Sequence, residues 1–220
     1  MKEPISTDID GLIEDVLTKE DQDKLTPSQV IGMLRDGNSR FVAGEVTIRN
    51  HKAQIRKAVL SQYPKAIVLS CVDSRVPVED VFDRGIGDMF VARVAGNFVN
   101  VDILGSMEFA CRVSGSKVIL VLGHEHCGAI KSAIDGVELG NITEMLSKVQ
   151  PAIEQTEFDG ERKSSNEKYV HQVTELNVRL NVDRIRSESA ILKQMEDDGE
   201  ILICGGLYDM DNGEVTFLDR

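Results

Sequence analysis

The feature that most constrains the fold is a series of short, strongly apolar runs separated by helical patterns. Four such runs lie at 66–70, 89–94, 118–122 and 201–204, and a further short one at 215–218 follows an Asp-Asn-Gly turn. A strand that is apolar on both faces has to be covered on both sides, which is typical of parallel sheets. The sequence therefore predicts an α/β fold, with a mainly parallel β-sheet flanked by helices.

The stretch ahead of the first apolar run is predicted to be helical. Thr26 and Gln29 have the spacing of a capping box, and Pro27 suits the first position of a helix. Apolar residues then recur at helical spacing, which predicts an amphipathic helix. Polar patterns at 8–20 and 52–62 predict two further helices.

We predict a single domain over residues 1–220, with an N-terminal helical arm at 1–60 and an α/β core at 61–220. Within the core, helices are expected between the second and third strands, at 164–188 and at 189–198. In sheets of this kind, ligands bind beyond the carboxyl ends of the strands. The loops that follow the first and third apolar runs should therefore hold the chemistry.

Composition and charge exclude several classes of protein. The chain has 220 residues, 41% of them hydrophobic, which is enough for a core without disulfides. Its formal net charge of -12 argues against nucleic acid or an anionic membrane as a partner, since both attract basic surfaces. No apolar run approaches the roughly 20 residues that span a bilayer. The chain starts without a basic and apolar leader, which predicts a cytoplasmic protein, or an exported one whose leader has been removed.

Three residues with metal-binding side chains follow two of the predicted strands. Cys71 follows the first apolar run, and His124 and Cys127 follow the third. Two thiolates and an imidazole suit tetrahedral zinc, and three protein ligands leave the open position that is typical of catalytic zinc sites. Cys111 and Cys204 fall within a predicted helix and a predicted strand, so we expect both in the core.

The residues around these ligands leave two roles open. His126 competes with His124 as the ligand, although His124 is preferred because it directly follows the strand. Asp73 lies two residues beyond Cys71, where it could reach a metal as a fourth ligand and close the site. Arg75 could instead hold that carboxylate away through a bidentate, charge-assisted pair.

In combination, these motifs resemble the β-class carbonic anhydrases. The resemblance rests on Cys-x-Asp-Ser-Arg at 71–75, Arg-x-Ala-Gly-Asn at 93–97 and Gly-His-x-x-Cys-Gly at 123–128. It extends from about residue 25 to the region of residue 208. The fold of that family is similar to the one predicted here, and its members assemble from dimers.

The resemblance implies a site and a reaction. Zn²⁺ would be held by Cys71, His124 and Cys127, with Asp73 and Arg75 as the catalytic dyad. The reaction would be the reversible hydration of carbon dioxide to bicarbonate and a proton, by zinc-bound hydroxide.

The resemblance also implies partners and supporting residues. The backbone at Gly128 is a candidate for binding a substrate oxygen, and His126 or His171 is a candidate proton carrier. A homodimer or a dimer of dimers is expected, with the N-terminal helices packing on the partner subunit.

Three alternatives are consistent with the same residues. A zinc hydroxide of this kind could hydrolyse carbon disulfide or carbonyl sulfide. Cys71 could be the nucleophile of a thiol enzyme, with His124 as its base. Asp73 could complete a closed, structural zinc site in a protein without enzymatic activity.

Overall fold

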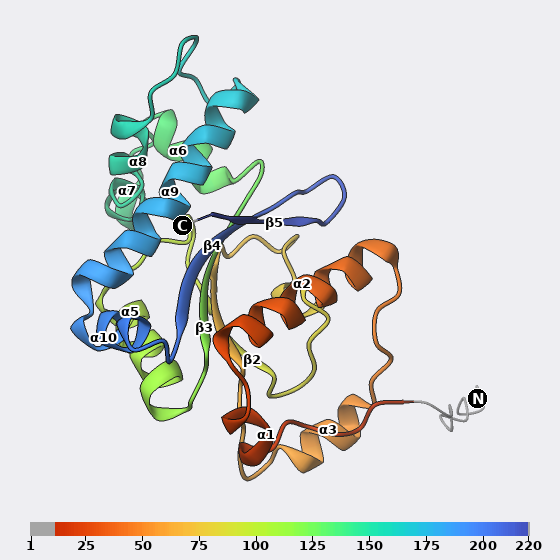
Figure 1. Ribbon diagram of the computed structural model, residues 1–220. Helices are drawn as coiled ribbons and strands as arrows, with labels where there is room; N and C mark the ends of the chain where they lie inside the picture. The colour runs from red at the N-terminus through yellow and green to blue at the C-terminus, as the bar shows by residue number, and fades with distance from the viewer. Residues whose placement is uncertain (1–11, 220) are drawn as a thin grey trace.

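A five-stranded sheet lies at the centre of residues 12–219, which are the residues that the computed structural model describes (Figure 1). The strand order is β2-β1-β3-β4-β5. The strands are β1 (Ala66–Ser70), β2 (Met89–Arg93), β3 (Val118–His124), β4 (Leu202–Tyr208) and β5 (Val215–Leu218). The first four run parallel, and β5 pairs antiparallel with β4. The predicted mainly parallel sheet is confirmed.

Helices flank the sheet on both sides. Those that precede β3 are α1 (Lys19–Asp23), α2 (Pro27–Ala43), α3 (His51–Lys57), α4 (Val78–Val81) and α5 (Val101–Glu108), which continues as the π-helical turn η1 (Phe109–Val113). Those that follow β3 are α6 (Gly128–Ile134), α7 (Gly140–Ser147), α8 (Gln150–Gln155), α9 (Glu167–Glu188) and α10 (Ala190–Asp197). Figure 1 shows α5, α9 and α10 on one side of the sheet and α2 on the other.

The side chains of β1 alternate between two hydrophobic cores. Ile67 and Leu69 belong to the core that α5, α9 and α10 complete. Ala66 and Val68 belong to the core on the opposite face, which α2 and α4 complete. All four side chains are at most 3% exposed. Because both faces are buried, positions 66–69 are all apolar, and only Ser70 at the end of the strand is polar.

The capping box predicted at the start of α2 is confirmed. The Thr26 hydroxyl accepts a hydrogen bond from the Gln29 backbone N–H at 3.2 Å, and the Gln29 side chain accepts one from the Thr26 N–H at 2.9 Å. Pro27 occupies the first helical position, and Gly44 ends the helix with a φ of 72°. Both ends of α2 are therefore fixed by local sequence.

The helix predicted at 8–20 is wrong over most of its described part, and residues 8–11 lie outside the described residues. Ile13 instead forms a β-bridge with Arg49, and its N–H donates to the Ile48 carbonyl at 3.0 Å. Helix α1 begins only after Thr18, whose hydroxyl accepts from the Asp21 N–H. Local periodicity missed this because the backbone groups of the segment pair with residues distant in sequence.

Other boundaries also differ from the prediction. Helix α3 is shorter than the predicted 52–62, and the prediction contained neither α7 nor α8. Helix α2 packs on its own sheet through Val30 and Leu34, which are 0% and 2% exposed. The division into an arm at 1–60 and a core at 61–220 stays a prediction.

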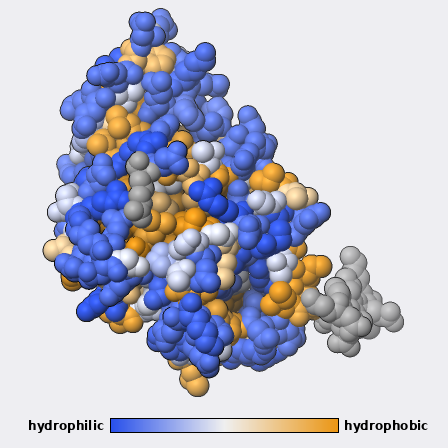
Figure 2. Space-filling view, in the orientation of Figure 1, coloured by the Kyte–Doolittle hydropathy of each residue, from blue (hydrophilic) through white to orange (hydrophobic). Residues whose placement is uncertain are grey.

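The visible surface is mostly hydrophilic. Hydrophilic residues cover most of the face seen in Figure 2, and hydrophobic residues gather near its middle. Within residues 12–219, no helix combines the length and the apolar character needed to cross a bilayer.

A buried carboxylate ties the segment between α2 and α3 to the core. The Asp83 side chain, 1% exposed, accepts hydrogen bonds from Arg40 Nε at 2.6 Å and from Arg49 Nη1 at 2.5 Å. It also accepts from the Thr47 N–H at 3.0 Å and the Thr47 hydroxyl at 2.6 Å. Burial alone would raise the pKa of Asp83, but the bonds from Arg49, Thr47 and Arg40 outweigh it and hold that pKa well below its usual range.

Replacing this carboxylate should destabilise the protein in a pH-dependent way. We expect Asp83→Asn to lower the free energy of unfolding by about 3 kcal/mol at neutral pH, because two arginines lose a buried partner. The folded-state pKa lies below the unfolded value of about 3.9, so the stabilisation is complete above about pH 5 and is lost as the pH falls below about 4. Urea unfolding at several pH values measures both effects.

The exposed Asp15–Lys57 ion pair provides a matched control. It also ties the N-terminal segment to α3, with a distance of 2.6 Å, but its Asp15 side chain is 92% exposed. Asp15→Asn should leave the unfolding free energy nearly unchanged, because exposed pairs contribute little. If both variants lost the same free energy of unfolding, the burial of Asp83 would not be the source of its contribution to stability.

Candidate metal centre

Three side chains with metal-binding atoms converge at the carboxyl edge of the sheet. Strands β1 and β3 are neighbours, with Ser70 opposite Leu122. Cys71 directly follows β1, His124 is the last residue of β3, and Cys127 is the N-cap of α6. Parallel pairing therefore brings the two predicted loops together, as expected at this edge of such a sheet.

The three side chains form a compact and buried cluster. The ligand atoms of Cys71, His124 and Cys127 all lie within 4.8 Å of one another. The two sulfur atoms are 4.0 Å apart. The residues are 4%, 0% and 0% exposed, respectively. His126, the competing candidate, is not a member of the cluster.

The hydrogen bond made by His124 fixes which of its nitrogen atoms can bind a metal. Its Nδ1 lies 2.8 Å from the backbone carbonyl of Glu125. A carbonyl can only accept, so Nδ1 carries the proton and Nε2 presents a lone pair. Nε2 is buried and has no hydrogen-bond partner among the described residues. A buried acceptor facing two thiols, with its other ring nitrogen donating to a carbonyl, is the arrangement of a metal-bound histidine.

The two thiols have strongly different proton affinities. The Cys127 side chain, in contact with Cys71, lowers the pKa of the Cys71 thiol to about 4, and His124 acts in the same direction. The same contact, together with burial, raises the pKa of Cys127 far above its usual range. The pair therefore carries one negative charge readily, and a second requires a cation beside it, which suits a divalent metal.

Asp73 and Arg75 form the predicted pair beside this cluster. Asp73 accepts from Arg75 Nε at 3.0 Å and from Arg75 Nη2 at 2.8 Å. The Arg75 N–H also donates to Asp73 Oδ1 at 2.9 Å, which shapes the turn. The hydrogen bond from the Arg75 side chain lowers the pKa of Asp73 to about 2, so the carboxylate is ionised. Its Oδ2 lies 3.9 Å from His124 Nε2, at the edge of the cluster.

Arg93 supports the same loop, and sequence reasoning gave it no role beyond the motif at 93–97. At the end of β2, it donates to the Cys71 carbonyl at 2.9 Å and to the Asp73 carbonyl at 2.5 Å. These bonds hold the backbone of a candidate ligand and of the candidate catalytic carboxylate together. The sequence signal that could have indicated this role was an arginine at the end of the strand that neighbours the first loop.

The remaining candidates lie around the cluster. His126 has a φ of 52°, and its Nδ1 is 3.8 Å from Glu167. His171 Nδ1 lies 3.5 Å from Glu125 and the side chain is half exposed. Gly128 is the first residue of α6, and a Cβ there would meet open space among the described residues. The proposed roles of these residues stay predictions.

The other cysteines lie elsewhere in the fold. Cys111 is buried in the core, as expected, and burial raises the pKa of its thiol to about 12. Cys204 lies in β4 and is only partly buried, so it is less enclosed than we expected.

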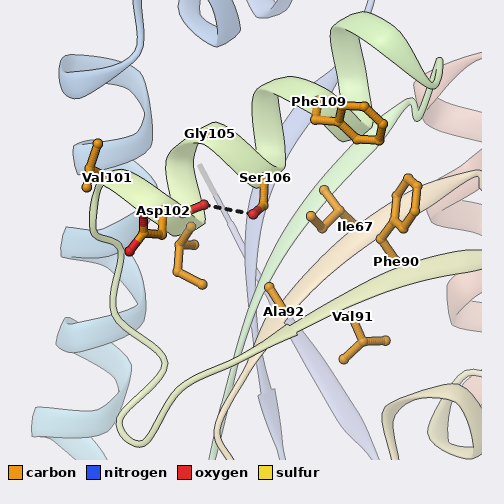
Figure 3. A pocket seen from close by; sticks show the side chains of 10 residues that line it. Ile67, Phe90, Val91, Ala92, Val101, Asp102, Gly105, Ser106 and Phe109 are labelled. Carbon is orange, nitrogen blue, oxygen red and sulfur yellow. Dashed lines mark hydrogen bonds between the residues drawn. The ribbon is translucent and has the colours of Figure 1, made fainter.

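A groove of about 760 Å³ lies beside β2 and α5, on residues other than those of the cluster (Figure 3). Phe90 and Phe109 meet there, with ring centroids 6.4 Å apart. The Ser106 hydroxyl donates a hydrogen bond to the Asp102 backbone carbonyl at 2.7 Å. The groove is therefore mainly apolar and lies along an edge strand.

Sequence and structure comparisons identify relatives of the chain. The carbonic anhydrase family model matches residues 66–215. Carbonic anhydrase 2 of Mycobacterium tuberculosis strain H37Rv is 30% identical over 195 residues, which cover 85% of this chain and 90% of the relative. The carbonic anhydrase of Mycolicibacterium smegmatis is 40% identical over 126 residues, which cover 54% of this chain and 61% of that protein.

Solved structures agree with this assignment. The β-carbonic anhydrase of Coccomyxa, solved with acetazolamide, has 25% identity and a TM-score of 0.69, and the match covers 88% of this chain and 86% of that one. A β-carbonic anhydrase of Sordaria macrospora, described as tetrameric, has the same fold, with 20% identity, a TM-score of 0.66, and coverage of 76% and 86%. The matched family model, the full-length relative and the shared fold show that this chain is an enzyme of the β-class carbonic anhydrase family.

Proposed function

We propose that the chain hydrates carbon dioxide reversibly to bicarbonate and a proton, at a zinc ion held by Cys71, His124 and Cys127. The observation that carries this proposal is the buried, unpartnered Nε2 of His124, which faces two thiols beside an arginine-held carboxylate. No residue within 12–219 forms a hydrogen bond with this nitrogen. Membership of the carbonic anhydrase family supports the reaction.

The donor set fits zinc better than other common metals. Two sulfur atoms and one imidazole nitrogen are soft and borderline donors, whereas magnesium and calcium prefer oxygen. Three ligands leave a fourth position for water or substrate. A zinc ion bound there supplies a Lewis acid that makes a coordinated water more acidic.

Asp73 is the proposed catalytic carboxylate. Its Oδ2 is the oxygen that faces the cluster, 3.9 Å from His124 Nε2. Because its pKa is lowered to about 2, this oxygen can only accept a hydrogen bond at neutral pH. It can therefore accept a hydrogen bond from an attacking water or hydroxide and so orient it. It disfavours the binding of a group that has no proton to donate.

Arg75 is the proposed positioning partner of Asp73. Its guanidinium donates hydrogen bonds to both carboxylate oxygens, and its backbone N–H donates a third to the same group. In this geometry the carboxylate is engaged by arginine and stays outside the ligand set. Release of the carboxylate would free Asp73 to occupy the fourth position and close the site.

A second copy of this chain is the proposed partner at the groove beside β2. Strand β2 is at the edge of the sheet, so one side of its backbone is unpaired within the described sheet. Val101 and Phe109, which line the groove, are 80% and 54% exposed. An exposed strand edge next to apolar side chains suits a self-complementary interface around a two-fold axis. The tetrameric Sordaria relative supports an oligomer of this kind.

Removing the Arg75 side chain should separate metal binding from catalysis. We expect Arg75→Ala to retain one zinc per chain but to lose about 100-fold or more in carbon dioxide hydration, because Asp73 is no longer held in place. Stopped-flow hydration assays and metal analysis on the same sample measure the two properties.

Arg75→Lys serves as the graded control. Lysine keeps the charge but cannot form the same pair of hydrogen bonds to both oxygens. The activity of Arg75→Lys should therefore fall between that of the wild type and that of Arg75→Ala. Hydration at the wild-type rate by Arg75→Ala would refute the role of the pair.

Removing one ligand should remove the metal. We expect Cys127→Ser to lose zinc and activity together, because a hydroxyl is a poor replacement for a buried thiolate. Cys111→Ala is the matched control, since it removes another buried thiol outside the cluster and should keep the zinc. Full zinc occupancy in Cys127→Ser would overturn the assigned ligand set.

A charge in the groove should weaken self-association. We expect Phe109→Glu to shift the protein toward monomers in sedimentation velocity, because a buried carboxylate opposes an apolar interface. Ile191→Glu is the control, as Ile191 is 46% exposed and lies outside the groove. An unchanged distribution for Phe109→Glu would place the interface elsewhere.

A further inference from the structure

Arg93 binds the loop of the candidate metal centre from a different strand. It is the last residue of β2 and lies opposite Ser70, the last residue of β1. The Val94 N–H donates to the Ser70 carbonyl at 3.1 Å, so the two strands stay paired up to the point where the Cys71 loop begins. The side chain of Arg93 therefore extends from the sheet itself.

The guanidinium of Arg93 spans two carbonyl groups of this loop. Its Nε donates to the Cys71 carbonyl at 2.9 Å, and its Nη2 donates to the Asp73 carbonyl at 2.5 Å. The Asp73 carbonyl also accepts from the Val76 N–H at 3.2 Å, which closes a turn. Because the guanidinium is planar and rigid, the spacing of its two donors fixes the backbone of Asp73 relative to that of Cys71.

Arg75 cannot provide the same anchor. It lies two residues from Asp73 in the same loop, and its side chain is 55% exposed. The Asp73–Arg75 pair can move together with the loop while both of its side-chain hydrogen bonds stay intact. Exposed ion pairs also contribute little by themselves. The position of Asp73 relative to the cluster therefore depends on bonds from outside the loop, such as the two from Arg93.

The carboxylate of Asp73 lies only just outside the reach of the cluster. Its Oδ2 is 3.9 Å from His124 Nε2. With bonds of about 2.0–2.2 Å, a nitrogen and an oxygen on one tetrahedral zinc ion lie about 3.4 Å apart. The oxygen is thus slightly farther from the histidine than a fourth ligand would be. A small shift of the loop toward the cluster is enough to bring it into the ligand set.

We propose that Arg93 is a positioning residue that keeps the fourth coordination position open, because it holds the Asp73 backbone away from the cysteine and histidine cluster. This inference rests on the proposed zinc site. Arg75 orients the carboxylate oxygens, whereas Arg93 anchors the loop that carries them. Loss of Arg93 produces a site that keeps its metal but is closed by Asp73.

The test measures whether an external anion reaches the metal in cobalt-substituted protein at fixed pH. Azide is the probe, because it needs an open coordination position and its binding changes the absorption of cobalt. The wild type is compared with Arg93→Ala, Asp73→Ala and the double variant that carries both changes. Arg112→Ala is the matched control, since Arg112 is another exposed arginine, and its ion-pair partner Glu200, 3.8 Å away, lies outside the loop.

We expect Arg93→Ala to retain one metal ion per chain and to bind azide about 10-fold more weakly than the wild type, or weaker still. A site that is closed in about nine molecules out of ten lowers the apparent affinity by this factor. The double variant should bind azide about as tightly as Asp73→Ala, because the competing carboxylate is gone. Arg112→Ala should behave like the wild type.

Three results would overturn the inference, and they are distinguishable. Azide binding at the wild-type affinity by Arg93→Ala would show that Arg93 does not keep the position open. Weak azide binding that persists in the double variant would show that Asp73 is not the group that closes it. If the wild type takes up neither zinc nor cobalt, the proposed metal site itself fails.

Arg93→Lys covers the case in which Arg93→Ala does not fold. Lysine keeps the charge but offers a single donor group, so it cannot span both carbonyls in the same way. Its azide affinity should lie below that of the wild type, and adding Asp73→Ala to the same protein should restore it. Unchanged azide affinity in Arg93→Lys would contradict the role of the two bonds.

Discussion

Parallel pairing of β1 with β3 is the constraint on which the candidate metal centre depends. Both strands are buried on two faces, so their register is fixed by the hydrophobic cores, and their carboxyl ends meet at one edge. Cys71 and His124 stand at those two ends, and Cys127 follows at the start of α6. The ligand atoms come within 4.8 Å of one another because the sheet brings these ends together.

Hydrogen bonds then fix the direction of each group at this edge. The Glu125 carbonyl sets the protonation of His124, and Arg75 holds the Asp73 carboxylate. Arg93 binds the backbone of the Cys71 loop from one side. The charges are arranged so that a divalent cation is favoured beside two thiols, while the carboxylate proposed as catalytic is held by arginine outside the cysteine and histidine cluster.

The sequence predicted the strands and the candidate ligands because both leave local signals. Apolar runs marked the strands, and His-x-x-Cys after one run marked two ligands. It failed where structure depends on distant pairing: Ile13 pairs with Arg49 instead of lying in a helix. It also could not predict the buried hydrogen bond from Asn177 to the Gly96 carbonyl, because the two residues are far apart in sequence.

The most direct test of the account follows carbon dioxide hydration by stopped flow while zinc is returned to metal-free protein. The account predicts that activity rises in proportion to bound zinc and saturates at one zinc per chain, with the metal held by the buried cysteine and histidine cluster. Hydration that is independent of zinc would contradict it, and so would a fully loaded protein that hydrates no carbon dioxide.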